Sequence, residues 1–153
     1  MPTSSGASFP HAEDAAKEYV HRRERGAAML DSADLVAFAP STDLERSRAF
    51  YTDVAGLEFI EQSPFACVFR SGGTMLRVTA VPEFTPHPFT VLGWAVADIH
   101  ASVAELRARG VEFLTFDNLP QDTDKIWTTP GGRIAWFRDP DGNVLSLTEF
   151  TGN

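Results

Sequence analysis

The fold is decided by residues 136–150, which read WFRDPDGNVLSLTEF. Pro140 fixes its φ at about −65° and has no N–H to donate, so it ends a strand. Gly142 and Asn143 can take the positive φ that a tight reversal of the chain requires. The stretch therefore predicts a complete β-hairpin with its turn at residues 139–143.

The second strand of this hairpin carries the first functional signal. From Val144 to Phe150, apolar side chains alternate imperfectly with polar ones, which is typical of a strand with one packed face and one face toward a cavity or solvent. Ser146 and Thr148 share the second face, because side chains alternate with a period of two. Glu149 has the opposite parity, so we expect it to point the other way.

The hairpin has an earlier counterpart at residues 68–79, which read VFRSGGTMLRVT. It aligns with residues 136–148 when one residue of the turn is dropped. The repeat extends further back, because residues 41–45 and 96–100 each open a helix after a strand. The chain therefore reads as two copies of one β-α-β-β-β unit.

This repeat predicts an α+β fold with two tandem βαβββ units at residues 34–81 and 90–150. In the first unit, the strands are expected at 34–40, 57–62, 66–70 and 75–81, and the helix at 43–55. In the second unit, the strands are expected at 90–96, 111–115, 125–129, 133–138 and 144–150, and the helix at 99–109. Residues 82–88 contain three prolines and are expected to link the units.

Two helix starts can be assigned to individual side chains. Thr42 is predicted to cap the first helix, with Glu45 three residues later completing a capping box. Asp98 is predicted to cap the second helix.

Residues 1–33 are predicted to be an extension outside the repeat. Residues 1–10 are rich in Ser, Gly and Pro and are expected to be disordered. Residues 11–25 have a narrow stripe of mostly alanine at helical spacing, and Gly26 is a plausible stop. This helix is either solvated or an arm that packs over a cavity or a partner subunit.

Composition restricts the class of partner. The 153 residues are 43% hydrophobic, enough for a core, and the net charge is −8, which argues against nucleic acid and anionic membranes and mildly favours cationic ligands. The lone Cys67 excludes an intrachain disulfide and is expected to be buried and structural. No apolar run approaches the roughly 20 residues of a membrane span, and the N-terminus lacks the order of a signal peptide. We therefore expect a cytoplasmic protein.

Several short motifs, in this order, resemble the vicinal oxygen chelate superfamily of glyoxalase, bleomycin-resistance and extradiol-dioxygenase relatives. They are residues 43–47 (DLERS), Phe50-Tyr51, Gly56-Leu57, Asp98-Ile99 and residues 137–143 (FRDPDGN). The resemblance covers roughly residues 34–150. It implies that each unit curls its sheet into half a cup with its helix on the outer face, and that paired units enclose a ligand cavity. It also implies a homodimer, since many members are dimers.

The chemistry that the resemblance implies is Lewis-acid catalysis by a divalent metal, held by His, Gln or Glu on the cup-lining strands. The matching positions in this chain are Leu35 or Val36, Val91, Arg77 and Ser146. Apolar side chains, one hydroxyl and one cation cannot hold a divalent ion tightly. We therefore expect no metal and no other cofactor.

Without a metal, the cup would be a binding site for a small molecule. The candidate ligand-binding residues are Arg77, Ser146, Thr148, Trp127, Val91 and Val36. Trp94, Trp127 and Trp136 lie on three strands of the second unit, where an aromatic wall would suit stacking on a planar ligand. Trp127 is the better candidate, whereas Trp94 is expected to meet the helix at 99–109. An inward Arg77 would need an anionic or carbonyl partner; the alternatives are surface exposure and pairing with a local carboxylate.

Different function classes follow from this cup. The first is a metal-independent binding protein for a planar or cationic molecule, which sequesters an antibiotic in the manner of the family's drug-resistance members. The second is an enzyme, either a lyase, isomerase or dioxygenase with displaced metal ligands or a metal-free catalyst in which Arg77 stabilises an oxyanion. No nucleophile and base at recognisable spacing support the enzyme. The third is a relative with a metabolic ligand.

Overall fold

The computed structural model of the chain describes Lys17 and residues 29–152. The chain divides into two compact units, residues 1–35 and 36–153. The described part of the first unit contains a short 3-10 helix, η1 (Leu30–Ser32). The disorder predicted for residues 1–10 and the helix predicted for 11–25 lie outside the described residues, except for Lys17, which is helical.

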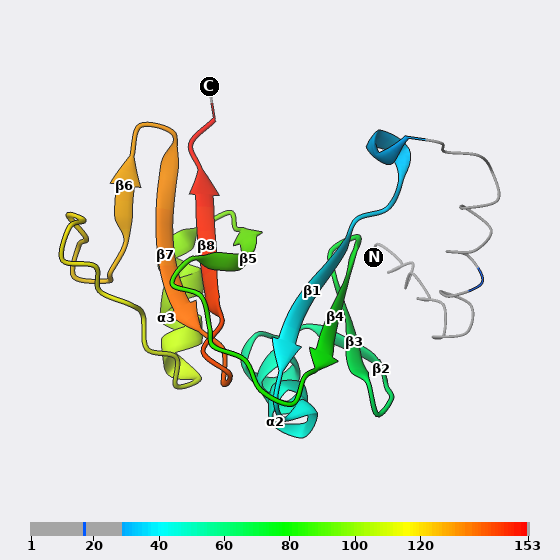
Figure 1. The fold of residues 1–153 in the computed structure, drawn as a ribbon. Coiled ribbons are helices and arrows are strands. Elements are labelled where there is room, and N and C mark those ends of the chain that lie inside the picture. The colour runs from blue at the N-terminus through cyan, green and yellow to red at the C-terminus, as the bar shows by residue number, and fades with distance from the viewer. Residues whose placement is uncertain (1–16, 18–28, 153) are drawn as a thin grey trace, which may run out of the picture. The chain divides into compact units, whose positions relative to one another are not determined.

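The second unit contains two four-stranded mixed sheets (Figure 1). The first module comprises β1 (Val36–Ser41), α2 (Leu44–Ala49), the π-helical η2 (Phe50–Val54), β2 (Glu58–Gln62), β3 (Ala66–Ser71) and β4 (Thr74–Ala80). The second module comprises β5 (Thr90–Ala95), α3 (Ile99–Ala108), β6 (Trp127–Thr129), β7 (Gly132–Arg138) and β8 (Val144–Phe150).

Both sheets have the same topology. The strand orders are β1-β4-β3-β2 in the first sheet and β5-β8-β7-β6 in the second. In each, the first strand runs parallel to the last and the remaining pairs are antiparallel. The α+β class and the tandem βαβββ units are therefore confirmed.

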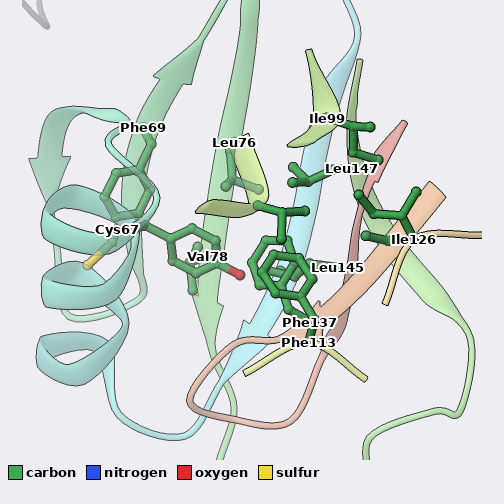
Figure 2. Close-up of a cluster of buried hydrophobic side chains, with 14 residues drawn as sticks. Cys67, Phe69, Leu76, Val78, Ile99, Phe113, Ile126, Phe137, Leu145 and Leu147 are labelled. Carbon is green, nitrogen blue, oxygen red and sulfur yellow. The ribbon is translucent and has the colours of Figure 1, made fainter. Parts of the chain in front are cut away.

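One face of each sheet packs into a common hydrophobic core. The first sheet contributes Phe69, Leu76 and Val78, and the second contributes Leu145 and Leu147. Figure 2 shows these side chains in one cluster. Because alternate residues of a strand point to opposite faces, each sheet has a second face directed away from this core, which we call the first and the second outward face.

The cysteine prediction is confirmed, because Cys67 belongs to this core and is fully buried. Its thiol donates to the Leu44 carbonyl oxygen at 3.5 Å, and burial raises the pKa of the thiol. A buried thiol with a raised pKa is a poor nucleophile.

The helix caps agree with the prediction at one helix only. Asp98 accepts from the Ala101 N–H at 3.1 Å, as expected. The cap of α2 is Asp43, which accepts from the Arg46 N–H at 3.1 Å. The predicted capping box at Thr42 is wrong, because the Thr42 hydroxyl donates to a carboxylate of the second module instead.

The strand predicted at residues 111–115 is also wrong. Phe113 is buried and the Leu114 N–H donates to the Trp136 carbonyl oxygen at 2.8 Å, but no strand forms here. The Gln121 side chain accepts from the Phe116 N–H at 2.7 Å and donates to the Leu114 carbonyl oxygen at 2.9 Å. The Gln121 side chain therefore forms hydrogen bonds with backbone groups that would otherwise bond to a neighbouring strand.

The hairpin turn agrees with the prediction in its glycine. Gly142 has φ +88°, whereas Asn143 does not take a positive φ. The Asp139 N–H donates to the Asn143 carbonyl oxygen at 3.0 Å and closes the turn. In the described part of the chain, no helix is long and apolar enough to cross a membrane.

Candidate ligand-binding faces

The first outward face is centred on Arg77. Arg77 lies directly opposite Phe38 on β1 and Val68 on β3, and Val36 lies opposite Met75. Directly opposite residues share a face, so Val36 and Arg77, which the sequence singled out, are on the same side of the sheet. Phe38 is 58% exposed, so this face presents an apolar ring beside a cation.

The second outward face carries two stacked tryptophans. The rings of Trp127 and Trp136 have centroids 6.1 Å apart and an interplanar angle of 25°. Trp136 lies opposite Ser146, and Ile134 lies opposite both Trp127 and Thr148. Trp127, Ser146 and Thr148 are therefore together on one face, and the strand pattern predicted this for Ser146 and Thr148.

Neighbouring side chains fix the position of the Trp136 ring. Its indole N–H donates to the Thr90 hydroxyl at 3.0 Å. Phe116 meets the ring edge to face, with centroids 5.2 Å apart. These contacts hold the indole as a preformed aromatic wall, whose flat surface suits stacking with a planar ring.

A glycine keeps the Ser146 hydroxyl in place. Gly93 lies opposite Ser146 on β5, and a Cβ on Gly93 would lie only 2.6 Å from the Ser146 hydroxyl oxygen. Ser146 is 7% exposed. A side chain at position 93 would therefore displace the hydroxyl, and the glycine keeps this polar atom available on the face.

Val91 and Trp94 occupy different surroundings. Val91 falls at a register shift between Thr90 and Leu92 and packs against the core. Trp94 is on the core side of β5, where its ring stacks on Phe137 with centroids 6.5 Å apart. Val91 is thus separated from the other residues predicted for the second outward face.

A cavity of about 670 Å³ opens on the core side of the sheets, away from both outward faces. Trp94 and Leu106 line it together with Ser71 of the first module, so Trp94 faces α3 across this space. The Trp94 indole N–H donates to the Ser71 hydroxyl at 2.9 Å. Arg109 pairs with Glu105 at 2.9 Å and donates to the Val54 carbonyl oxygen at 3.2 Å. The principal polar groups of this cavity therefore already have protein partners.

The turn between β7 and β8 joins the two modules. Tyr51 donates its hydroxyl to Asp139 Oδ2 at 2.7 Å, and Asn143 donates its amide to the same oxygen at 2.8 Å and to the Pro40 carbonyl oxygen at 2.9 Å. Burial, followed by the Asp139 carboxylate, raises the pKa of the Tyr51 hydroxyl. We call this set of contacts, with those of Asp141 below, the clasp.

Asp141 provides the second half of the clasp. Its Oδ1 accepts from the Thr42 N–H at 2.8 Å and the Thr42 hydroxyl at 2.7 Å, and Arg46 lies 3.1 Å from the same oxygen. Its Oδ2 accepts from the Ser47 hydroxyl at 3.1 Å. Burial raises the pKa of the Asp141 carboxyl, but the hydrogen bonds outweigh it, so the net pKa is below the ordinary value. The ionised form is therefore the one that the fold stabilises.

The divalent metal implied by the resemblance does not fit the side chains at the four marked positions. Leu35 or Val36 and Val91 have no donor atom, Arg77 is a cation, and Ser146 offers a single neutral hydroxyl. Within residues 29–152, together with Lys17, no three His, Cys, Asp or Glu side chains form a group that could hold an ion.

Sequence reasoning considered Trp136 for an aromatic wall but did not keep it among the candidate site residues, and it did not select Thr90 and Phe116, which complete the wall. The parity of Trp136 with Ser146 was a usable signal, since both flank the same turn at matched distances. Thr90 and Phe116 could not be found in this way, because their contacts depend on how distant segments fold onto β7.

The family of the chain follows from comparison with known proteins. The model of the Glyoxalase/Bleomycin resistance protein/Dioxygenase superfamily matches residues 32–147. No curated protein matches the chain.

Solved structures share the fold over most of the chain. TnmS3, an antibiotic-binding protein from Streptomyces sp. CB03234, is 27% identical with a TM-score of 0.63, covering 82% of this chain and 100% of that one. A glyoxalase/bleomycin resistance protein from the same organism is 27% identical with a TM-score of 0.58, covering 76% and 100%. A glyoxalase family protein from Bacillus anthracis is 20% identical with a TM-score of 0.63, covering 78% and 96%. The chain therefore belongs to the Glyoxalase/Bleomycin resistance protein/Dioxygenase superfamily.

Proposed function

We propose that the protein binds a planar small molecule without a metal and sequesters it. The observation that carries this proposal is the stacked pair Trp127 and Trp136 beside the hydroxyls of Ser146 and Thr148. Two indoles with a few polar atoms provide stacking area together with orientation, which is the usual composition of a ligand site. TnmS3, described as antibiotic-binding, supports an antibiotic as the ligand.

We further propose that two copies of the chain form each site. The two outward faces lie on opposite sides of a shared core, so they cannot face each other within one copy. Both present exposed apolar side chains, with Phe38 58% and Phe150 71% exposed. A homodimer would cover these rings and bring the first outward face of one copy against the second outward face of the other.

The binding proposal is tested by titrating the protein with neutral anthracene derivatives while following tryptophan fluorescence. Trp127→Leu should weaken binding about tenfold, since it removes a stacking partner and apolar contact area. Trp94→Leu is the matched control, because Trp94 is on the core side; it should lower the melting temperature and leave the affinity unchanged. Equal affinity in wild type and Trp127→Leu would contradict the proposal.

The shared site is tested by complementation between two defective chains. Arg77→Met and Trp127→Leu chains with different tags are co-expressed, the mixed dimer is purified, and its binding of anthracenecarboxylate is titrated. If each site is made from two copies, one of the two sites in the mixed dimer carries both substitutions and the other carries neither. The mixed dimer should therefore bind ligand at half the wild-type stoichiometry. Light scattering that shows only monomer, or a mixed dimer without binding, would refute the shared site.

Metal independence is tested by elemental analysis of the purified protein, together with thermal shifts on adding nickel, zinc, manganese, iron or EDTA. We expect no stoichiometric metal and no shift. Stoichiometric metal, or a shift of several degrees, would favour a lyase, isomerase or dioxygenase with metal ligands at other positions.

A second candidate function is a metal-free enzyme, which Arg77 favours because it has no partner within residues 29–152. A guanidinium without a protein partner could stabilise an oxyanion as charge develops. The two functions differ in what Arg77→Ala changes. Loss of affinity with no conversion of bound ligand in wild type supports a binding protein, whereas loss of turnover at unchanged affinity supports an enzyme.

A further inference from the structure

We propose that the ligand of this site carries an acidic group, such as a carboxylate, and that Arg77 binds it. This inference rests on the proposed binding function and specifies the chemical class of its ligand. It depends on three features of the described residues. Arg77 has no partner among them, carboxylates are scarce on both outward faces, and the polar atoms of the second outward face, which would face Arg77 in the proposed dimer, include neutral hydroxyls.

Arg77 differs from the other arginines between residues 29 and 152. Each of the others has a protein partner, as follows: Arg46 with Asp141, Arg48 with Gln62, Arg70 with Glu58, Arg107 with Asp124, Arg109 with Glu105, Arg133 with Glu149, and Arg138 with the Gly142 carbonyl oxygen. Arg77 has no hydrogen bond, ion pair or ring contact in the described structure, although it is partly buried. A partly desolvated cation with five unused donors favours an anionic partner.

The carboxylates of the first outward face do not meet this need. Glu58 pairs with Arg70 at 3.8 Å. Glu61 lies opposite Val68, which in turn lies opposite Arg77, so two strand spacings, about 10 Å, separate their backbones. Arg77 therefore keeps its charge uncompensated on this face.

The strands of the second outward face carry no acidic side chain. The residues on this side of β5, β6, β7 and β8, read from their register, are Thr90, Gly93, Ala95, Trp127, Thr129, Gly132, Ile134, Trp136, Arg138, Val144, Ser146, Thr148 and Phe150. Hydroxyls and an arginine, but no carboxylate, would therefore face Arg77 across the proposed dimer. A cationic ligand would find no counter-charge among these strand residues.

The net charge of −8 does not reverse this preference. Two carboxylates, Asp139 and Asp141, are used in the clasp, and Glu149 on the core side of β8 pairs with Arg133 at 3.0 Å. Exposed charges more than about 10 Å from the ligand are largely screened at physiological salt. The local guanidinium therefore decides the sign of the ligand's charge.

The inference is tested with three probes that share one ring system, namely anthracenecarboxylate, anthracenecarboxamide and aminomethylanthracene. Wild type should bind the carboxylate at least tenfold more tightly than the amide, and the cation most weakly. Arg77→Met, which keeps an unbranched apolar stem without the guanidinium group, should weaken carboxylate binding by about 10- to 100-fold and leave amide binding unchanged, because only the charge-assisted hydrogen bonds are lost. Added salt should weaken carboxylate binding only.

Arg48→Met is the matched control. Arg48 lies over the Phe59 ring at 3.8 Å, on the core side of the first sheet, so its removal changes the net charge equally and should not alter the preference for the carboxylate. An amide that binds as tightly as the carboxylate would overturn the acidic class while sustaining the binding function. Failure of all three probes to bind would overturn the binding function and this inference with it.

Discussion

The two hairpin turns of the repeat have opposite roles. The turn between β3 and β4 is built from Gly72 and Gly73, where an added Cβ would meet nothing within 4 Å. The turn between β7 and β8 buries Asp139 and Asn143 to 5% and 3% exposure and binds them to the first module. The difference teaches that two turns at equivalent positions of the repeat can have different roles, because the second turn adds buried polar contacts to the hydrophobic core that the modules share.

The largest effect is expected from Asp139→Ala, which removes the acceptor at the centre of the clasp. Asp139→Ala would leave the Tyr51 hydroxyl and the Asn143 amide without this acceptor, together with the backbone N–H groups of Asp141 and Asn143. Several buried donors would lose their partner, so we expect the free energy of unfolding to fall by about 3–5 kcal/mol. Urea denaturation followed by circular dichroism measures this value.

Ser71 is the matched control for Asp139, because each follows an arginine at the end of the strand before its turn. Ser71→Ala removes one acceptor, for the Trp94 indole N–H, and should cost about 1 kcal/mol. Equal losses for the two variants would mean that the clasp does not stabilise the second turn more than the first.

The second prediction concerns pH. The folded-state pKa of Asp141 lies below its unfolded value, so between the two values the unfolded chain binds more protons and stability rises with pH. The contribution of Asp141 is complete above the unfolded value of about 4 and is lost as pH falls through the folded value. Asp141→Asn should lower stability at pH 7 by about 2 kcal/mol and make it less sensitive to acid below about pH 4. Melting temperatures measured from acid to neutral pH test this prediction. If Asp141→Asn leaves the dependence of the melting temperature on pH unchanged, this role is contradicted.

The third prediction compares the glycines of the two turns. Gly142 has φ +88°, and a Cβ there would lie 2.9 Å from Pro86 Cγ, whereas Gly72 has φ +56° and free space. Gly142→Val should therefore cost more than the roughly 1 kcal/mol of conformational strain expected for Gly72→Val. The difference in melting temperature between Gly142→Val and Gly72→Val isolates the contribution of the contact with Pro86. Equal shifts in melting temperature would show that the segment around Pro86 moves to make room for the new side chain.

The smallest effect is expected from removing residues 1–28. Both turns, both sheets and the clasp belong to the unit at residues 36–153. A chain that begins at Met29 should therefore melt within about a degree of the full chain. A large loss of melting temperature would mean that the first unit stabilises the modules.

Much of the fold could be predicted because local rules decide it. Strand alternation around Ser146 and Thr148, the glycine at position 142 and the cap at Asp98 each depend on neighbours in sequence, and each was recovered. The strand expected at residues 111–115 failed because Gln121, several residues later, satisfies its backbone. A side chain took the place of the expected neighbouring strand there.

The site was predictable only in part for the same reason. Parity placed Arg77, Val36, Trp127, Ser146 and Thr148 on faces, but it could not foresee the register shift that separates Val91. The clasp was missed because the residues at 139–143 were fully explained as turn residues. The unused signal was the presence of three polar side chains in a turn whose conformation requires only a glycine.

The shared core has a consequence for synthesis of the protein. The hydrogen bonds of the clasp that connect the two modules join residues 88 to 103 positions apart, so they can form only when nearly the whole chain has left the ribosome. Until then, the core side of the first sheet, with Phe69, Leu76 and Val78, lacks the covering that the second module provides. Such a nascent chain exposes a hydrophobic surface and is prone to aggregate. Slow translation of the second half would lengthen that exposure and make the newborn protein depend on chaperones.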